Sequence, residues 1–188
     1  MRLRLLGTTT FDGEPVGLGS RDRQLLALLA VHAPDPVGNN LIVDELWGEQ
    51  PPKNPTNAIQ ASVSRLRKKL ASPIELTQSG YRLDLEPGEI DFVVVERLVQ
   101  EVRSSNDSSA RLVHATRAAE LARRGLEGVS PLVERRIESL ALAAEELYSE
   151  ALVDERRFSE ATVALEDLVT AHPYRESLWG LLMRSLYG

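Results

Sequence analysis

The segment from residue 56 to residue 70, Thr-Asn-Ala-Ile-Gln-Ala-Ser-Val-Ser-Arg-Leu-Arg-Lys-Lys-Leu, combines side chains that could contact a nucleic acid. At helical spacing one side of it is apolar and suited to a protein core, through Ile59, Val63, Leu66 and Leu70. The opposite side is short, polar and basic, with Asn57, Gln60, Ala61, Ser64, Arg65, Arg67 and Lys68. Short side chains permit close approach to a duplex, while arginine and lysine reach base edges or phosphates. The pattern therefore favours a helix that enters the major groove of DNA.

The charge distribution supports this hypothesis, although the total charge does not. The chain of 188 residues has a formal net charge of −6 at pH 7, which by itself argues against nucleic-acid binding. Residues 57–83, however, hold five cations and one carboxylate, a local charge of +4. A locally positive element on an acidic body can bind phosphates while its other faces repel DNA.

The elements around the basic segment are predicted to form a winged helix-turn-helix. Before it, we expect strands at residues 2–6 and 16–18, a helix from Ser20 to just before Pro34, and a helix from Leu41 to Trp47. A proline-rich loop, residues 49–55, leads into the basic helix, which Thr56 is expected to cap. After it, residues 74–77 and 81–85 alternate as a β-hairpin should. Three helices and a hairpin of this kind place the basic helix in the groove and use the hairpin as a wing.

The second half of the chain is predicted to be entirely helical. Pro87-Gly88 marks a boundary, which divides the chain into a domain of residues 1–90 and a domain of residues 91–188. The candidate helices cover residues 92–102, 109–124, 131–155, 159–172 and 174–187. The spacing of a tetratricopeptide repeat is matched by Ala161, Leu165, Leu168 and Pro173, and that of the next unit by Trp179, Leu182 and Leu186. Because this second unit has only its first helix, we expect a truncated domain, or an edge covered by another subunit.

Several short runs, which together cover nearly the whole chain, carry a family resemblance: Gly19-Ser20-Arg21-x-Arg23-Gln24-Leu25-Leu26, Leu46-Trp47, Val63-Ser64-Arg65-Leu66-Arg67-Lys68-Lys69-Leu70, Gly80-Tyr81-x-Leu83 and Pro173-Tyr174-Arg175-Glu176. With these motifs the chain resembles the Streptomyces antibiotic regulatory protein family. The resemblance implies an α+β N-terminal winged helix-turn-helix of the OmpR/PhoB type. It further implies an all-α, tetratricopeptide-like bacterial transcriptional activation domain behind it. Members of the family are bacterial activators of secondary metabolism or cell-wall genes that bind direct repeats.

The resemblance also implies roles for individual residues. Residues 56–71 would form the recognition helix, and the implied DNA contacts are Thr56, Asn57, Gln60, Ser62, Ser64, Arg65, Arg67 and Lys68, with Thr77 and Tyr81 on the wing. The loop of residues 49–55 would contact RNA polymerase, through Glu49, Gln50, Lys53 and Asn54. The implied partners are double-stranded DNA, RNA polymerase and a second copy of the chain, as a homodimer or in tandem on DNA. The wing departs from the family pattern, because Gln78 stands where a cation is common.

Several of these features also have purely structural interpretations that involve no ligand. A basic run is commonly a solvated helix face, and Thr77 and Tyr81 could serve only as cross-strand partners in the hairpin. Trp47 and Trp179 have apolar neighbours and are expected to be core anchors. The main alternative function is a protein-interaction adaptor, in which the helical repeat domain binds a partner and the winged helix docks protein.

Composition and spacing argue against other classes of protein. The three histidines lack metal-ligand spacing and no nucleophile–base arrangement stands out, so we expect no enzyme, cofactor or metal. The chain has no cysteine, no 18-residue apolar run and no signal peptide. These features predict a cytoplasmic protein without a membrane-spanning segment.

Overall fold

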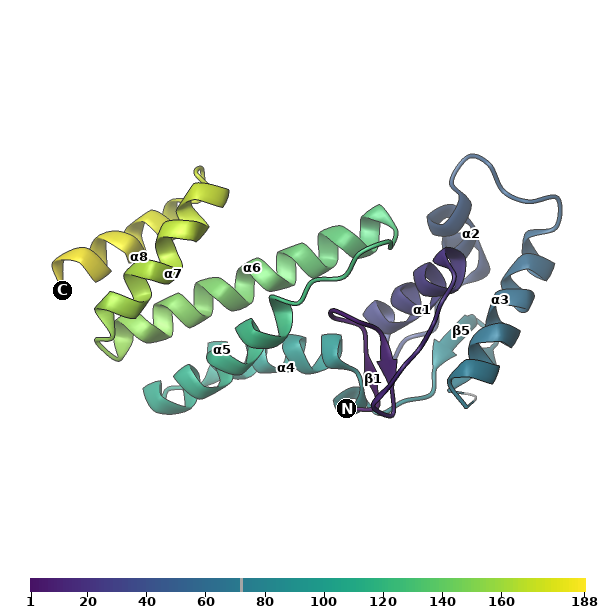
Figure 1. Cartoon of the computed structure of the whole chain (residues 1–188), viewed down its shortest axis with the longest axis horizontal. Helices are drawn as coiled ribbons and strands as arrows, with labels where there is room; N and C mark the ends of the chain where they lie inside the picture. The colour runs from purple at the N-terminus through teal and green to yellow at the C-terminus, as the bar shows by residue number, and fades with distance from the viewer. Residues whose placement is uncertain (72) are drawn as a thin grey trace. The chain divides into compact units, whose positions relative to one another are not determined.

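The computed structural model describes residues 1–188 except Ser72 (Figure 1). The chain forms two compact units. The first contains residues 1–94 and 124–138, and the second contains residues 95–123 and 139–188.

The first unit begins with a small antiparallel sheet. Strand β1 (Leu3–Arg4) pairs with β2 (Thr10–Phe11), which pairs with β3 (Glu14–Pro15). The reversal between β2 and β3 takes place at Asp12 and Gly13, whose φ angles are 49° and 90°. The expected strand at residues 16–18 is therefore wrong, because this two-residue turn brings the returning strand in earlier along the chain.

Three helices follow the sheet. Helix α1 (Ser20–His32) is the centre of the unit, since all of its residues from Leu25 to Val31 are buried. Helix α2 (Asn39–Trp47) ends at Gly48, whose φ of 55° terminates the helix. Helix α3 (Pro55–Lys69) packs against both α1 and α2. These bounds agree with the expected helices to within about two residues, which is the ordinary uncertainty of helix ends.

The start of α3 differs from the expectation. Asn54, and not Thr56, is the N-cap: its side-chain oxygen accepts a hydrogen bond of 3.1 Å from the backbone N–H of Asn57. Pro55 occupies the first helical position, where its missing N–H is not required and its fixed φ suits the helix. The apolar side predicted for this helix is buried in the structure: Ile59, Val63, Leu66 and Leu70.

A β-hairpin completes the winged-helix arrangement. Strand β4 (Ile74–Thr77) pairs with β5 (Gly80–Leu83) in a register that places Glu75 opposite Arg82 and Leu76 opposite Tyr81. Two backbone hydrogen bonds, of 2.7 and 3.0 Å, join Tyr81 to Val37 ahead of α2. Gly80 has a φ of 139°, and a Cβ added there would lie 1.9 Å from the carbonyl oxygen of Val37. Only glycine permits the hairpin to approach the chain so closely.

A buried carboxylate connects the first strand region to the helix after the wing. A 3-10 turn η1 (Pro87–Glu89) leads to α4 (Asp91–Ser104). The carboxylate of Asp91 accepts hydrogen bonds of 2.8–3.0 Å from the backbone N–H groups of Leu5, Leu6 and Phe92. Burial raises the pKa of the Asp91 carboxyl above its ordinary value, against the lowering effect of these N–H groups. Asp91 thereby satisfies two buried amides of the N-terminal segment.

The second unit is helical throughout its described elements. It is built from parts of α4 and α6 (Pro131–Asp154) together with α5 (Ser108–Ala122), α7 (Phe158–Ala171) and α8 (Glu176–Tyr187). Helices α7 and α8 pack against each other (Figure 1). Their shared core contains Leu152, Ala161, Leu165, Leu178 and Leu182. The winged-helix region and the all-helical region confirm the predicted fold class.

The two tryptophans are less buried than expected. Trp179 is 42% exposed on α8, and its indole N–H donates a hydrogen bond of 2.9 Å to the carbonyl of Pro173. The expectation that it is a core anchor is wrong, because Leu178, Leu181 and Leu182 occupy the buried side of the helix. Trp47 is half-buried, with the guanidinium of Arg21 placed 5.8 Å from its ring centre. Among the described residues, none of the helices has the length and apolarity needed to cross a membrane.

Candidate nucleic-acid interface

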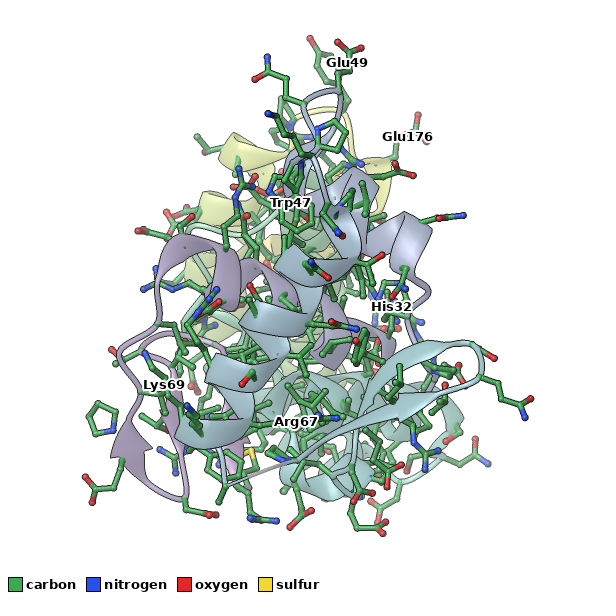
Figure 2. All side chains as sticks on the ribbon, turned by 90° about the vertical axis from the view of Figure 1, so that its right-hand side faces the viewer. His32, Trp47, Glu49, Arg67, Lys69 and Glu176 are labelled. Carbon is green, nitrogen blue, oxygen red and sulfur yellow. The ribbon has the colours of Figure 1, made fainter. Side chains whose placement is uncertain are left out.

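The outward side of α3 is a continuous polar surface. Its exposed residues recur every three or four positions: Asn57, Gln60, Ala61, Ser64, Arg65 and Lys68. This spacing places them along one side of a helix, opposite the buried stripe. Thr56 is also exposed, at the start of the helix. Figure 2 shows α3 from outside, with Glu49 in the loop beyond its first turn and Arg67 and Lys69 toward its last turn. We refer to the exposed residues 56–68 of α3 as the outer face.

The four cations of α3 have different surroundings. Lys68 is exposed and has no hydrogen-bond or ion-pair partner within the part of the chain that the structure describes. Arg67 is half-buried, and its Nε donates a hydrogen bond of 2.9 Å to the carbonyl of Ile74 in the wing. Lys69 donates to the carbonyl of Gly17. Arg67 and Lys69 therefore attach the end of α3 to its neighbours, whereas Lys68 remains available to a ligand.

Arg65 is held by a carboxylate on α1. Its Nε and Nη2 donate to the two oxygens of Asp22, at 2.8 and 2.7 Å, and Nη2 also donates to the hydroxyl of Ser62 at 2.9 Å. Asp22 is 5% exposed. Burial raises the pKa of its carboxyl, but the hydrogen bonds from Arg65 and Ser62 and the positive charges of Arg65 and Lys69 outweigh burial and lower the pKa. Asp22 is therefore an ionised partner of Arg65.

Ser62 does not lie on the outer face. It is 2% exposed and contacts the Arg65–Asp22 pair, so the expectation that it faces the groove is wrong. The physical reason was visible in the spacing: position 62 lies three residues after Ile59 and four before Leu66, on the side of the helix that faces the core.

The wing presents little free positive charge. Arg82 donates two hydrogen bonds to Glu75 across the hairpin, at 2.8 and 3.0 Å, so this pair is formally neutral. The Thr77 hydroxyl donates to the carbonyl of Gly80 at 3.0 Å and accepts from the N–H of Ser79. Tyr81 is 4% exposed, which corrects the expectation that its side chain meets DNA. It shares a strand face with the buried Leu83, and this is the sequence signal for its inward direction.

The loop before α3 is open to solvent. Glu49, Gln50, Lys53 and Asn54 are all exposed, and the Asn54 side chain is engaged in capping α3.

No group of three or more histidine, aspartate or glutamate side chains in the described residues is arranged to hold a metal ion. The outer face of α3 is thus the candidate binding surface of this unit. Its polar side chains and its basic end suit a nucleic acid.

A winged helix joined to tetratricopeptide-like helices defines a class of bacterial transcription regulators. Two family models match the chain in agreement with this architecture. Residues 13–83 match the C-terminal domain of transcriptional regulatory proteins, and residues 90–188 match the bacterial transcriptional activator domain. The chain therefore belongs to the Streptomyces antibiotic regulatory protein family, as its motifs indicated. This is a family of regulators and not of enzymes.

Named relatives of the chain come from Mycobacterium and from Streptomyces. EmbR, a transcriptional regulatory protein of Mycobacterium tuberculosis, is 31% identical over 199 residues, which cover 95% of this chain and 50% of EmbR. RedD, a transcriptional regulator of Streptomyces coelicolor, is 34% identical over 218 residues, which cover all of this chain and 59% of RedD. The solved structure of M. tuberculosis EmbR in complex with a low-affinity phosphopeptide matches with a TM-score of 0.74 and 27% identity. It is matched over 99% of this chain and 55% of that one, so the chain spans about half the length of EmbR.

Proposed function

We propose that this chain activates transcription by reading direct-repeat promoter sites through α3 and by recruiting RNA polymerase. The outer face of α3 is the main support for the proposal. It is polar, it begins with short side chains, and it is cationic toward its end, on a chain that is otherwise acidic. A carboxylate on that face would repel the phosphates of a duplex, and residues 56–69 contain neither aspartate nor glutamate. The helix is also fixed to its neighbours through Arg65 and Arg67, so the face is presented rigidly.

The proposed contacts divide by chemistry. Asn57, Gln60 and Ser64 are candidates for base contacts, because amide and hydroxyl groups can donate to and accept from base edges. Lys68, Arg65 and Arg67 are candidates for phosphate contacts, since they follow these residues at the basic end. Thr56 at the start of the helix and Thr77 on the wing complete the proposed surface.

Partners beyond DNA are proposed from the remaining exposed segments. The loop with Glu49, Gln50, Lys53 and Asn54 precedes α3 and is exposed, and it is the proposed contact for RNA polymerase on the same promoter. One copy offers few cations, so two copies bound in tandem are needed for tight binding. We assign the DNA-binding role to residues 1–90 and the activation role to residues 91–188, and we place the protein in the cytoplasm.

Selection of bound sites from random duplexes tests the proposal directly. The whole chain is expected to enrich two copies of one short sequence in the same orientation. Mobility-shift titrations with the selected duplex should then show binding that weakens steeply with salt, by about 0.9 in the log–log slope for each phosphate neutralised. Failure to enrich any sequence, together with salt-independent or absent binding, would remove the proposal.

An interaction adaptor is the second candidate function. It is favoured by exposed large apolar side chains on α8, with Met183 56%, Leu186 57% and Tyr187 89% exposed. Exposed apolar groups of this kind mark surfaces that contact other proteins. Retained capture of a protein partner by a chain that binds no duplex would favour the adaptor over the activator.

A further inference from the structure

Most of the donors of Arg65 are already used within the protein. A guanidinium has five N–H groups, one on Nε and two on each terminal nitrogen. The Nε hydrogen is bonded to Asp22, and the two hydrogens of Nη2 are accounted for by Asp22 and Ser62. Only the two hydrogens of Nη1 have no partner within the part of the chain that the structure describes. The side chain as a whole is 53% exposed, so Arg65 still reaches the surface of the outer face.

The groups that hold Arg65 cannot follow it outward. Asp22 is 5% exposed and Ser62 is 2% exposed, and Asp22 belongs to α1, whose residues 25–31 form the centre of the unit. Pulling the guanidinium away would leave a buried carboxylate without its partner, which is costly. The arrangement is therefore fixed before any DNA arrives.

This arrangement restricts which part of DNA Arg65 can contact. Recognition of guanine by arginine uses two N–H groups that point in parallel at O6 and N7, and these come from two different nitrogens. The two free hydrogens of Arg65 share one nitrogen and diverge within the guanidinium plane, so they do not match this pair of acceptors. A phosphate oxygen needs only one such donor.

From this geometry we infer that Arg65 anchors the chain to a DNA phosphate and reads no base, and that Asp22 is the positioning residue that enforces this role. The inference rests on the proposed function and sharpens it. Sequence information would then come from the exposed side chains ahead of Arg65, which are Asn57, Gln60 and Ser64. Asp22 carries this role from α1, outside the helix that touches DNA.

A double variant, Asp22→Asn with Arg65→Ala, tests the role of Arg65 without burying an unpaired carboxylate. Affinities are measured by mobility shift for the duplex selected by the wild type and for a scrambled duplex, after thermal unfolding has shown that the variant folds. Both affinities are expected to fall by the same factor, so that their ratio stays within about twofold of the wild-type value. Gln60→Ala is the matched comparison and is expected to lower the ratio by about five- to 150-fold, the range for loss of one base contact.

The single variant Asp22→Asn tests the positioning role. It retains Arg65 but weakens its restraint, so selection from random duplexes should yield a guanine preference at a position where the wild type has none. A purely structural role for Asp22 would weaken all duplexes alike and leave the preferred sequence unchanged, and this result would overturn its assignment as a positioning residue.

Two further outcomes would overturn the role of Arg65. One is a fall of more than fivefold in the affinity ratio of the double variant, which would make Arg65 a reader of bases. The other is unchanged affinity for both duplexes, which would mean that Arg65 does not contact DNA. Absence of binding by the wild type would instead count against the proposed function itself, so the two failures are distinguishable.

Discussion

Helix α3 and the β4–β5 hairpin are neighbours in one unit, yet their charged side chains are arranged differently. On the helix, Lys68 is unpaired within the described residues and Arg65 keeps part of its guanidinium exposed. On the hairpin, Arg82 is paired with Glu75, and Tyr81 is buried in the core. The helix therefore presents positive charge to solvent, and the hairpin largely neutralises its own.

This difference separates two roles that a winged helix commonly combines. The hairpin supports the fold, because Gly80 and Tyr81 join it to the chain before α2 and Ile74 accepts a hydrogen bond from Arg67. The helix carries the surface that suits a duplex. Variants at the hairpin positions that join it to the core should therefore affect mainly stability, and variants of the outer face should affect mainly DNA affinity.

The largest expected effect is on stability and comes from Gly80→Ala. The new Cβ would lie 1.9 Å from the Val37 carbonyl oxygen at a φ of 139°, so the hairpin must move away from the chain before α2. We expect a loss of about 2–4 kcal/mol in the free energy of unfolding, measured with urea. Gly17→Ala is the matched control, because a Cβ there meets nothing within 4 Å. Equal stability of the two variants would show that the hairpin is not fixed to the core.

The next effect in size is on DNA affinity and comes from Lys68→Ala. Removing this unpaired cation should weaken binding to all duplexes and reduce the salt slope by about 0.9 if it neutralises one phosphate. If Lys68 instead contacts a base, the loss should be about 1–3 kcal/mol and confined to the selected site. Titrations over a range of salt concentrations distinguish the two, and unaltered binding would remove Lys68 from the interface.

A smaller effect on stability is expected from Arg67→Ala. Loss of the hydrogen bond from Arg67 to the Ile74 carbonyl should cost about 1 kcal/mol in the free energy of unfolding. Arg67→Lys keeps the charge but not the Nε donor and should be equally destabilised. If Arg67→Ala were as stable as the wild type, the hydrogen bond to Ile74 would contribute nothing to the stability of the fold.

The smallest expected effect comes from Glu75→Gln. It removes the negative partner of Arg82 and leaves the hairpin with an uncompensated cation. Stability should change by less than about 1 kcal/mol, because both side chains are nearly half exposed. DNA affinity should rise a few-fold at low salt and return to the wild-type value at high salt. A decrease in affinity would contradict the view that the wing masks its own charge.

The sequence predicted the elements of the winged helix more reliably than the side-chain contacts between them. Periodicity located α3 and its buried stripe, since both follow from spacing within one segment. The Arg65–Asp22 pair joins positions 43 residues apart, and no local pattern reports a contact of that kind.

Two of the features that differ from expectation have local signals in the sequence. Asn54 followed by Pro55 is a recognisable helix start, and it explains why Thr56 is not the cap. Tyr81 alternates with Leu83, which indicated that it faces the core. Trp179 differs from these cases, because its partial exposure depends on how α7 and α8 pack and could not be read from its apolar neighbours.

The carboxylate of Asp91 has a practical consequence for dissecting this protein. The match to the regulator domain stops at residue 83, which invites an expression boundary just after the wing. A fragment cut there would lack the acceptor for the amides of Leu5 and Leu6, and the segment after its first strand would lose its hydrogen bonds to the start of α4. A minimal duplex-binding fragment should therefore extend past the first turn of α4.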